Sequence, residues 1–319
     1  MIACDLDPDT LTARCRALIE ELGLGRAADV GAVTPLTGGV ASDIARVELG
    51  GRALCVKFAL PRLRVAADWR APVHRNAAEY AWLSVAAQVC PDSAVALLGR
   101  SETQHGFAME YLEGQGVTLW KAALLEGRAR GGEAGQVADL LGRIHAQSAT
   151  PGFDRTPFDN RKDFYALRIE PYLVEAGRVH RDLADPLRAL AAMLYDSAQV
   201  LVHGDVSPKN ILFRDSGPVL LDAECATMGD ASFDLSFCLN HLVLKAAHLP
   251  GSRALLGAEI ASFWQAYAPH VTWEPAAALE ARVCRLLPGL MLARQQAASR
   301  RSSTLPPPRG RRSAPCRGS

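Results

Sequence analysis

Residues 201–224 bring more chemistry together than any other part of this sequence. An apolar strand leads into a His-Gly-Asp turn that ends at Asp205, Asn210 follows five positions later, and a second apolar strand ends in Asp222-Ala-Glu224. Two adjacent strands deliver these oxygen donors to one place, and such hard donors suit Mg²⁺ better than a soft transition metal. The pattern predicts a phosphoryl-transfer site with Asp205 as the catalytic carboxylate and the other three residues as metal ligands. A lone His-Gly-Asp turn is equally consistent with simple capping, so the prediction depends on those three residues.

The remaining pattern divides the chain into two unequal parts near residue 112. The first part is rich in strand signals, and the second is mostly helical apart from the strands at 200–222. We therefore expect an α+β fold with a small sheet-rich lobe, residues 1–112, and a larger helical lobe, residues 113–298. Strands are expected at 33–36, 44–49, 53–59, 94–98 and 106–109, and helices at 9–24, 74–90, 117–126, 133–149, 160–176, 184–198, 231–247, 253–268 and 275–295.

The motifs at 203–210 and 222 resemble those of the aminoglycoside phosphotransferase/choline kinase superfamily, small-molecule kinases similar in fold to eukaryotic protein kinases. That family writes its catalytic loop as His-Gly-Asp, four residues and Asn, and places a metal-binding Asp at the end of a strand shortly afterwards. The resemblance extends over roughly residues 30–295. It implies a protein-kinase-like two-lobed fold, the use of ATP and Mg²⁺, and transfer of the γ-phosphoryl group to a hydroxyl of a small polar molecule.

Lys57 is the one cation on an otherwise apolar strand. Such a lysine is either an exposed edge residue or a buried charge with a partner. In the kinases that the chain resembles, this lysine grips the nucleotide phosphates and pairs with a Glu on the following helix. Glu79 is the matching acid here, and Glu113 is its rival.

Two further segments match the nucleotide site of the resembled kinases. Gly38 and Gly39 stand where those kinases fold a hairpin over the phosphates, with Ser42 as an additional donor, although any hairpin uses adjacent glycines. The strand ending near Glu110 resembles the inter-lobe hinge. By that resemblance, backbone groups from Glu110 to Leu112 bind the adenine edge.

The segment between Lys57 and Glu79 resembles one that methylthioribose kinases carry at this place, where an Ala-x-Pro-x-x-Arg stretch leads to a Trp. The Asp-x-Glu pair at 222–224 is similar to the same branch. That branch lacks an Asn at the position of Asn210, so the resemblance does not fix its sugar as the acceptor. The inserted side chains either shape the mouth of the site or form a solvated basic loop; they are Arg62, Arg64, Trp69 and Arg70.

Three polar residues of the second part are expected to have supporting roles. His145 lies on an apolar helix face, which favours a packed, hydrogen-bonded histidine. Asp234 matches an Asp that anchors the catalytic-loop backbone in the kinase fold. Asp230 is expected to cap the helix that follows it.

Bulk properties argue against several other classes. The formal charge is +1, so nothing global indicates a nucleic-acid partner. No apolar run approaches the roughly 20 residues of a membrane helix, and the acidic start is unlike a signal peptide. Eight cysteines without paired short spacings favour free thiols over a zinc site or a disulfide scaffold. We expect a cytoplasmic protein without membrane or nucleic-acid partners; the oligomeric state stays open.

The expected acceptor pocket lies between the helices at 160–176 and 275–295. Aminoglycoside-modifying kinases line this pocket with carboxylates because their substrates are polycations. Residues 275–298 offer Glu280 as their only acid, against Arg282, Arg285 and Arg294, whereas the helix at 160–176 is mixed. Its acids are Asp163, Glu170 and Glu175, beside Arg161, Lys162 and Arg168. The sequence therefore predicts a neutral or anionic acceptor, such as a sugar or hydroxy-metabolite, with an aminoglycoside-modifying kinase as the alternative.

Two alternatives of other classes remain. A protein kinase is disfavoured because Gly204 stands in place of the usual Arg and few residues separate Asp222 from the next helix. A non-catalytic nucleotide-binding pseudokinase is consistent with the same motifs. Residues 299–319 hold six Arg, no acid and a Pro-Pro-Pro run, which predicts a disordered basic tail. One hypothesis is that the chain leaves an ancestral reading frame near Arg294, and the gene's nucleotide sequence tests it.

Overall fold

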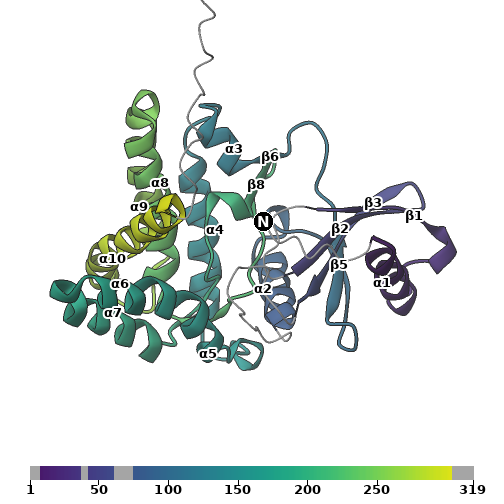
Figure 1. The fold of residues 1–319 in the computed structure, drawn as a ribbon, viewed down its shortest axis with the longest axis horizontal. Coiled ribbons are helices and arrows are strands. Elements are labelled where there is room, and N and C mark those ends of the chain that lie inside the picture. The colour runs from purple at the N-terminus through teal and green to yellow at the C-terminus, as the bar shows by residue number, and fades with distance from the viewer. Residues whose placement is uncertain (1–7, 37–41, 61–74, 304–319) are drawn as a thin grey trace, which may run out of the picture.

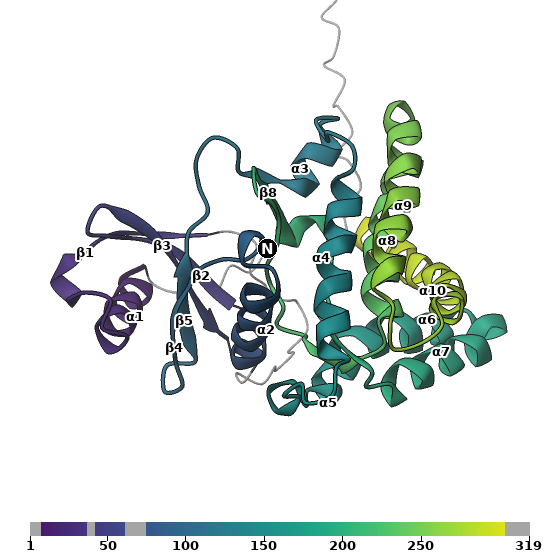
Figure 2. The ribbon, with the colours of Figure 1, turned by 180° about the vertical axis from the view of Figure 1, so that it is seen from behind.

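The computed structural model describes residues 8–36, 42–60 and 75–303, and they form the expected two lobes (Figure 1). The smaller lobe is a five-stranded antiparallel sheet in the order β1-β2-β3-β5-β4, with α1 on one face and α2 between the sheet and the larger lobe (Figure 2). Its elements are α1 (Pro8–Glu21), β1 (Val30–Pro35), β2 (Ser42–Leu49), β3 (Arg52–Ala59), α2 (Arg75–Val89), β4 (Leu97–Ser101) and β5 (Gly106–Glu110).

The alternation of side chains along β3 explains how one strand contributes to the cores on both faces of the sheet. Side chains of a strand point to opposite faces in turn, so Val56 and Phe58 pack with the α1 core, whereas Cys55 packs with the α2 core. Lys57 shares the face of Cys55 and is therefore directed toward Glu79 on α2. A single register fixes both the apolar packing and the direction of the one cation.

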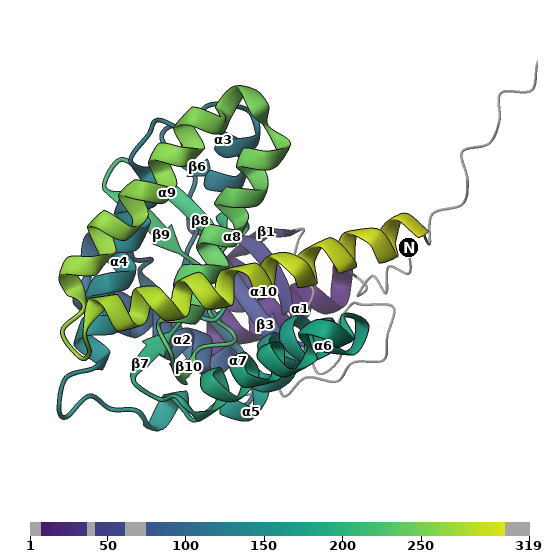
Figure 3. The same cartoon turned by 90° about the vertical axis from the view of Figure 1, so that its left-hand side faces the viewer.

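The larger lobe is mainly helical, and it encloses the catalytic strands. Helix α4 packs on α9, and α8 packs on α10, which crosses the lobe as one long helix (Figure 3). A two-stranded sheet pairs β7 with β10, and a three-stranded sheet has the order β6-β8-β9. The elements are β6 (Thr118–Leu119), α3 (Trp120–Leu125), α4 (Glu133–Ser148), α5 (Arg161–Phe164), a π-helix (Tyr165–Val174), α6 (Glu175–Val179), α7 (Ala184–Asp196), β7 (Val200–Val202), β8 (Ile211–Arg214), β9 (Gly217–Leu220), β10 (Thr227–Gly229), α8 (Ser232–His248), α9 (Arg253–Tyr267) and α10 (Ala276–Ser303).

The structure departs from the expected elements in several places. The helix expected at 117–126 begins only at Trp120, as α3, and strand β6 precedes it at Thr118–Leu119. The strand expected at 94–98 is β4 at Leu97–Ser101, because a 3₁₀ turn at Pro91–Ser93 delays it. The helix expected at 160–176 is divided by the π-helix, which contains Pro171. Strand β10 was not expected. Helix α10 continues to Ser303, so the first five residues of the stretch assigned to a disordered tail are helical; residues 304–319 lie outside the described residues.

Two further observations concern bulk expectations. None of the helices in the described residues combines the length and the apolar character needed to cross a membrane. Six cysteines fall within the described part of the chain, and all six are free thiols. Five of them are buried as expected, whereas Cys284 is exposed.

Candidate active site

The catalytic loop leaves β7 through a turn that only glycine fits. Gly204 has φ of +80°, and a Cβ at this position would stand 2.9 Å from both Cβ and the carbonyl oxygen of Cys225. Any larger residue would therefore combine an unfavourable backbone conformation with a clash against backbone. This explains why the motif reads His-Gly-Asp here and why the arginine of protein kinases has no room.

Asp234 fixes the loop from α8, as expected from the sequence. Its carboxylate accepts hydrogen bonds from the backbone N–H of His203 at 2.6 Å and of Gly204 at 2.9 Å. His145 lies behind it, with Nε2 3.4 Å from Asp234 and Nδ1 2.7 Å from the Tyr267 hydroxyl. All of these groups are buried, so His145 is a structural residue in a closed hydrogen-bond network.

Asp230 has the expected capping position ahead of α8. Its carboxylate accepts a hydrogen bond from the backbone N–H of Ser232 at 2.9 Å. The same carboxylate forms an ion pair with Arg282 at 2.9 Å, and Arg282 also pairs with Glu274. Arg282, counted above among the cations near the acceptor, is therefore already neutralised by two carboxylates.

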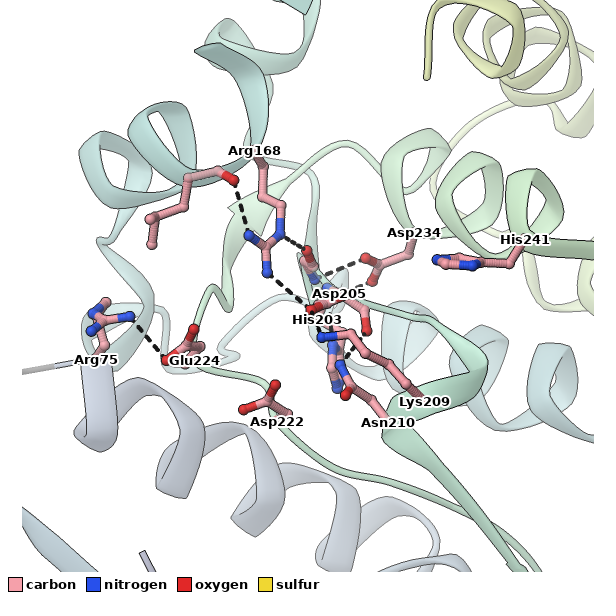
Figure 4. Close-up of polar contacts among 12 residues, drawn as sticks. Arg75, Arg168, His203, Asp205, Lys209, Asn210, Asp222, Glu224, Asp234 and His241 are labelled. Carbon is pink, nitrogen blue, oxygen red and sulfur yellow. Dashed lines mark hydrogen bonds and ion pairs between the residues drawn. The ribbon is translucent and has the colours of Figure 1, made fainter. Parts of the chain in front are cut away.

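Asp205 is buried, and two cations face one of its oxygens. Arg168 Nη2 lies 3.2 Å and Lys209 Nζ lies 3.1 Å from Oδ2 (Figure 4). Burial alone would raise the pKa of Asp205, but Arg168 and Lys209 outweigh it and lower that pKa. In the described part of the chain no hydrogen bond reaches Oδ1. An ionised carboxylate with one free oxygen is what a base for a substrate hydroxyl requires.

Asn210 and Asp222 present free oxygens to the same cleft. Asn210 Nδ2 donates to the backbone carbonyl of Asp205 at 3.1 Å, which directs its Oδ1 the other way. Asp222 has φ of +69°, a strained conformation for a non-glycine residue. Among the described residues only its Oδ1 is engaged, by Lys57 at 2.6 Å. These two oxygens fit Mg²⁺, which typically takes one or two protein carboxylates and completes its shell with phosphates and water.

Glu224, the third predicted metal ligand, has an additional partner. Its Oε2 lies 2.9 Å from Arg75 Nη1, at the start of α2 (Figure 4). Burial and the nearby charge of Asp222 raise the pKa of Glu224, against the opposing effect of Arg75. No cluster of three His, Cys, Asp or Glu residues is present in the described ranges, so Asn210 and phosphate oxygens are needed to complete a metal site.

Lys57 forms the ion pair that the sequence suggested. Its Nζ lies 2.7 Å from Glu79 and 2.6 Å from Asp222, whereas Glu113 pairs with Arg46. Burial would lower the pKa of Lys57, but the carboxylates around it outweigh burial and raise that pKa. Burial raises the pKa of Glu79 to about 7 in spite of the cation. Lys57 is thus a buried, charged group shared between the two lobes.

A cleft of about 500 Å³ lies between the lobes; Lys57, Asn210 and Asp222 line it, whereas Asp205 and Glu224 are not among its lining residues. Glu110 and Leu112 line it at the hinge; the backbone of Leu112 has no hydrogen bond within the described residues, so its N–H and C=O are available to a ligand. Ser42 is buried at the start of β2 and does not line the cleft. Gly38 and Gly39, like the inserted residues at 62–70, lie outside the described residues.

Three site residues were not singled out by motif. Arg168 and Lys209 contact Asp205, and Arg75 contacts Glu224. Lys209 directly precedes Asn210, and its spacing of four from Asp205 was an available signal. Arg168 and Arg75 are distant in sequence from their partners, and only the folded chain shows these contacts.

The fold is that of protein-kinase-like phosphotransferases. Like them, the protein has two lobes, a cleft beside the hinge, and this arrangement of Lys, Glu, Asp and Asn. The model of the phosphotransferase enzyme family (APH) matches residues 32–287, and the chain belongs to this family. A solved amicoumacin kinase with AMP-PNP, Ca²⁺ and its ligand superposes with a TM-score of 0.55 at 16% identity, covering 92% of this chain and 89% of that one. This likeness confirms the fold class expected from the sequence.

Curated relatives of similar sequence include methylthioribose kinases. The methylthioribose kinase of Erwinia tasmaniensis is 26% identical over 223 residues, which are 61% of this chain and 55% of that protein. That of Yersinia enterocolitica is 25% identical over 247 residues, 69% and 61% of the two chains. The alignments thus span only 55–61% of the length of these relatives.

Proposed function

We propose that this protein transfers the γ-phosphoryl group of ATP to a hydroxyl of a small polar molecule. The observation that carries the proposal is the state of Asp205, ionised by Arg168 and Lys209 on Oδ2 and free of hydrogen bonds on Oδ1. In this proposal Oδ1 orients the acceptor hydroxyl and accepts its proton as the new phosphorus–oxygen bond forms.

The remaining site residues hold the nucleotide side of the reaction. Lys57, fixed by Glu79, orients the phosphates, and the hinge backbone from Glu110 to Leu112 binds the adenine edge. Asn210 and Asp222 hold Mg²⁺, with Glu224 a direct or water-mediated contributor through its second oxygen. When bound, the ion neutralises phosphate charge during transfer. Gly38, Gly39 and Ser42 remain candidates for the phosphate hairpin.

The acceptor we propose is neutral or anionic, a sugar or hydroxy-metabolite in the manner of the methylthioribose kinases that the chain resembles. Support comes from Arg168 and Lys209, the two cations at Asp205. Three acids at the two helices expected to form the pocket have partners: Glu170 and Glu175 pair with Arg178, and Glu274, which precedes α10, pairs with Arg282. An aminoglycoside would have to leave its positive charges beside Arg168 and Lys209 without partners.

A substrate panel with Mg-ATP tests the proposal, using methylthioribose, choline, homoserine and kanamycin-type aminoglycosides. Asp205→Asn should abolish measurable phosphorylation of the true acceptor, while binding of Mg-ATP, measured by calorimetry, should largely persist. Full turnover in that variant would show that Asp205 has another role. If kanamycin is phosphorylated with kcat/KM near 10⁴ M⁻¹s⁻¹, the low end of typical enzyme values, the proposal of a neutral or anionic acceptor is wrong. The protein is then an aminoglycoside-modifying kinase.

A further inference from the structure

A group of basic side chains near Asp205 has no carboxylate to balance it. Lys121 on α3, His241 and Lys245 on α8, and Arg294 on α10 are here called the basic cluster. His241 and Lys245 stand one helical turn apart on the same face. Across the described ranges, no ion pair joins Lys121, Lys245 or Arg294 to a carboxylate.

The basic cluster lies beside the catalytic loop. Helix α8 carries Asp234, which binds the loop backbone, and His241 follows it by seven residues, about 10 Å along the axis. Figure 4 shows His241 on this helix, with Asp234 between it and the catalytic loop in this view. The charges of Asp205 and Lys209 both act on the pKa of His241. Lys121 lines the nucleotide cleft together with Lys209, so the cluster adjoins the cleft as well.

Arg294 has donors that the protein leaves unused. Its Nη2 donates to His241 Nε2 at 2.8 Å, and its guanidinium stands 5.2 Å from the centre of the Phe237 ring. Within the described residues, neither its buried Nε nor its Nη1 has a hydrogen-bond partner. Because His241 Nε2 accepts this bond, its ring proton is assigned to Nδ1, which also lacks a protein partner among the described residues.

Without a neighbouring carboxylate in the described part of the chain, the charged form of Lys245 is destabilised. Burial, then Lys121 and Arg294, lower the pKa of Lys245 to about 8. Residues 295–319 contain no Asp or Glu. Arg282, on the same helix, has two carboxylates. Free donors with like charges around them are the arrangement of an anion-binding site.

We propose that the acceptor carries an anionic group, a carboxylate or a phosphate, which binds Arg294 and Lys245 while its hydroxyl meets Asp205. This inference rests on the proposed function and narrows it to hydroxy acids and phosphorylated alcohols. His241 Nδ1 adds a neutral donor. Lys121 supplies further positive potential at the border of the nucleotide cleft.

Anion binding tests the site without reference to turnover. The full-length chain, saturated with Mg-ADP to occupy the nucleotide cleft, is titrated with inorganic phosphate and with malonate by calorimetry. We expect binding to be weakened about tenfold or more in Arg294→Gln and in Lys245→Gln, the loss of a charge-assisted hydrogen bond. Arg285→Gln is the matched control: the sequence counted Arg285 among the cations near the acceptor, but in the structure it is exposed on α10, outside the basic cluster, and donates to the carbonyl of Ala281 on its own helix.

No binding in the wild type, or equal binding in all four proteins, overturns the inference. Stronger binding of malonate indicates a carboxylate acceptor, and stronger binding of phosphate indicates a phosphorylated one. Both results support an anionic acceptor, provided that the two cluster variants lose the binding.

Turnover separates this inference from the proposed function. Matched pairs, glycerol with glycerate and ribose with ribose 5-phosphate, are assayed with Mg-ATP. We expect higher kcat/KM for the anionic members, and a rise in KM for them in Arg294→Gln and Lys245→Gln. Preference for the neutral members overturns the inference. If the cluster binds anions but the wild type phosphorylates nothing, the proposed function fails while the anion site stands.

Discussion

At the scale of single residues, Arg168 sets the charge of Asp205. It contacts Oδ2 and also donates to the carbonyl of Gly204, so it fixes both the charge and the position of the loop. Its own buried charge has no other acidic partner than Asp205 among the described ion pairs. The two residues therefore behave as one unit, with Lys209 as the more exposed second cation.

Replacing Arg168 should shift the pH dependence of the reaction. Arg168 lowers the pKa of Asp205, and the ionised form is the active one. In Arg168→Met that pKa rises, so the acidic limb of the kcat/KM profile should move to higher pH, and the loss of kcat/KM relative to the wild type should grow as the pH falls. The control is Arg188→Met, an exposed residue paired with Asp185. An unchanged acidic limb with reduced kcat would show that Arg168 acts only through loop position.

His241 should make stability depend on pH in a defined window. Burial, Arg294 and Lys245 lower the pKa of His241 to about 2. The unfolded chain takes up a proton near pH 6.5 and the folded chain does not, so stability falls as pH drops below about 6.5. The loss reaches about 2 kcal/mol at pH 5. The measurement is the free energy of urea unfolding at pH 8 and at pH 5. The difference between the two should be smaller in His241→Gln than in the wild type by this amount. An equal difference in the two proteins would show that His241 does not cause the loss.

At the scale of elements, α4 is capped from another helix. Glu259 of α9 accepts hydrogen bonds from the backbone N–H groups of Gly132 and Ala134 at the start of α4. Glu133 accepts from the Trp120 indole N–H at 2.9 Å and extends the arrangement to α3. A carboxylate at a helix start satisfies unpaired N–H groups and complements the helix dipole. One buried side chain thus joins two helices that are distant in sequence.

Glu259→Ala should destabilise the protein and leave chemistry nearly intact. The buried N–H of Ala134 and the partly buried N–H of Gly132 lose their acceptor, which costs about 1–3 kcal/mol in total. We expect a lower midpoint of urea unfolding with kcat within about twofold of the wild type, since Glu259 is not among the residues that line the cleft. Glu280→Ala, an exposed position on α10, serves as the control. A large fall in kcat under conditions where the variant is fully folded would show that α4 helps to position the catalytic residues.

Elements of this chain were predictable to different degrees, for physical reasons. The register of β3 and the loop around Asp205 follow from local patterns, because alternation and a glycine-only turn are written in adjacent residues. The π-helix containing Arg168 was not predictable, because its backbone depends on Pro171 and on long-range packing. The contact of Arg75 with Glu224 spans 149 positions. Of the basic cluster, which comes from three helices, the sequence pattern pointed only to Arg294.

At the scale of the whole molecule, buried ion pairs connect the two lobes across the cleft. Lys57 on β3 contacts Asp222, and Arg75 on α2 contacts Glu224. Both carboxylates follow β9 within the larger lobe. The relative position of the lobes is therefore fixed by the same residues that we propose to hold the phosphates and the metal. A ligand that engages Asp222 must change the partners of Lys57 as it binds.

The Arg75–Glu224 pair offers the cleanest measurement of this connection, because neither residue is the proposed base. Arg75 is 2% exposed and Glu224 15% exposed, at 2.9 Å. Removing one partner leaves a buried charge, so a double-mutant cycle with Arg75→Met and Glu224→Gln should give a coupling of about 1–3 kcal/mol in urea unfolding. The exposed pair Arg188–Asp185 is the matched control, with an expected coupling below about 0.5 kcal/mol. Equal coupling in the two cycles would mean that this contact does not hold the lobes together, and that the connection depends on Lys57 and Asp222.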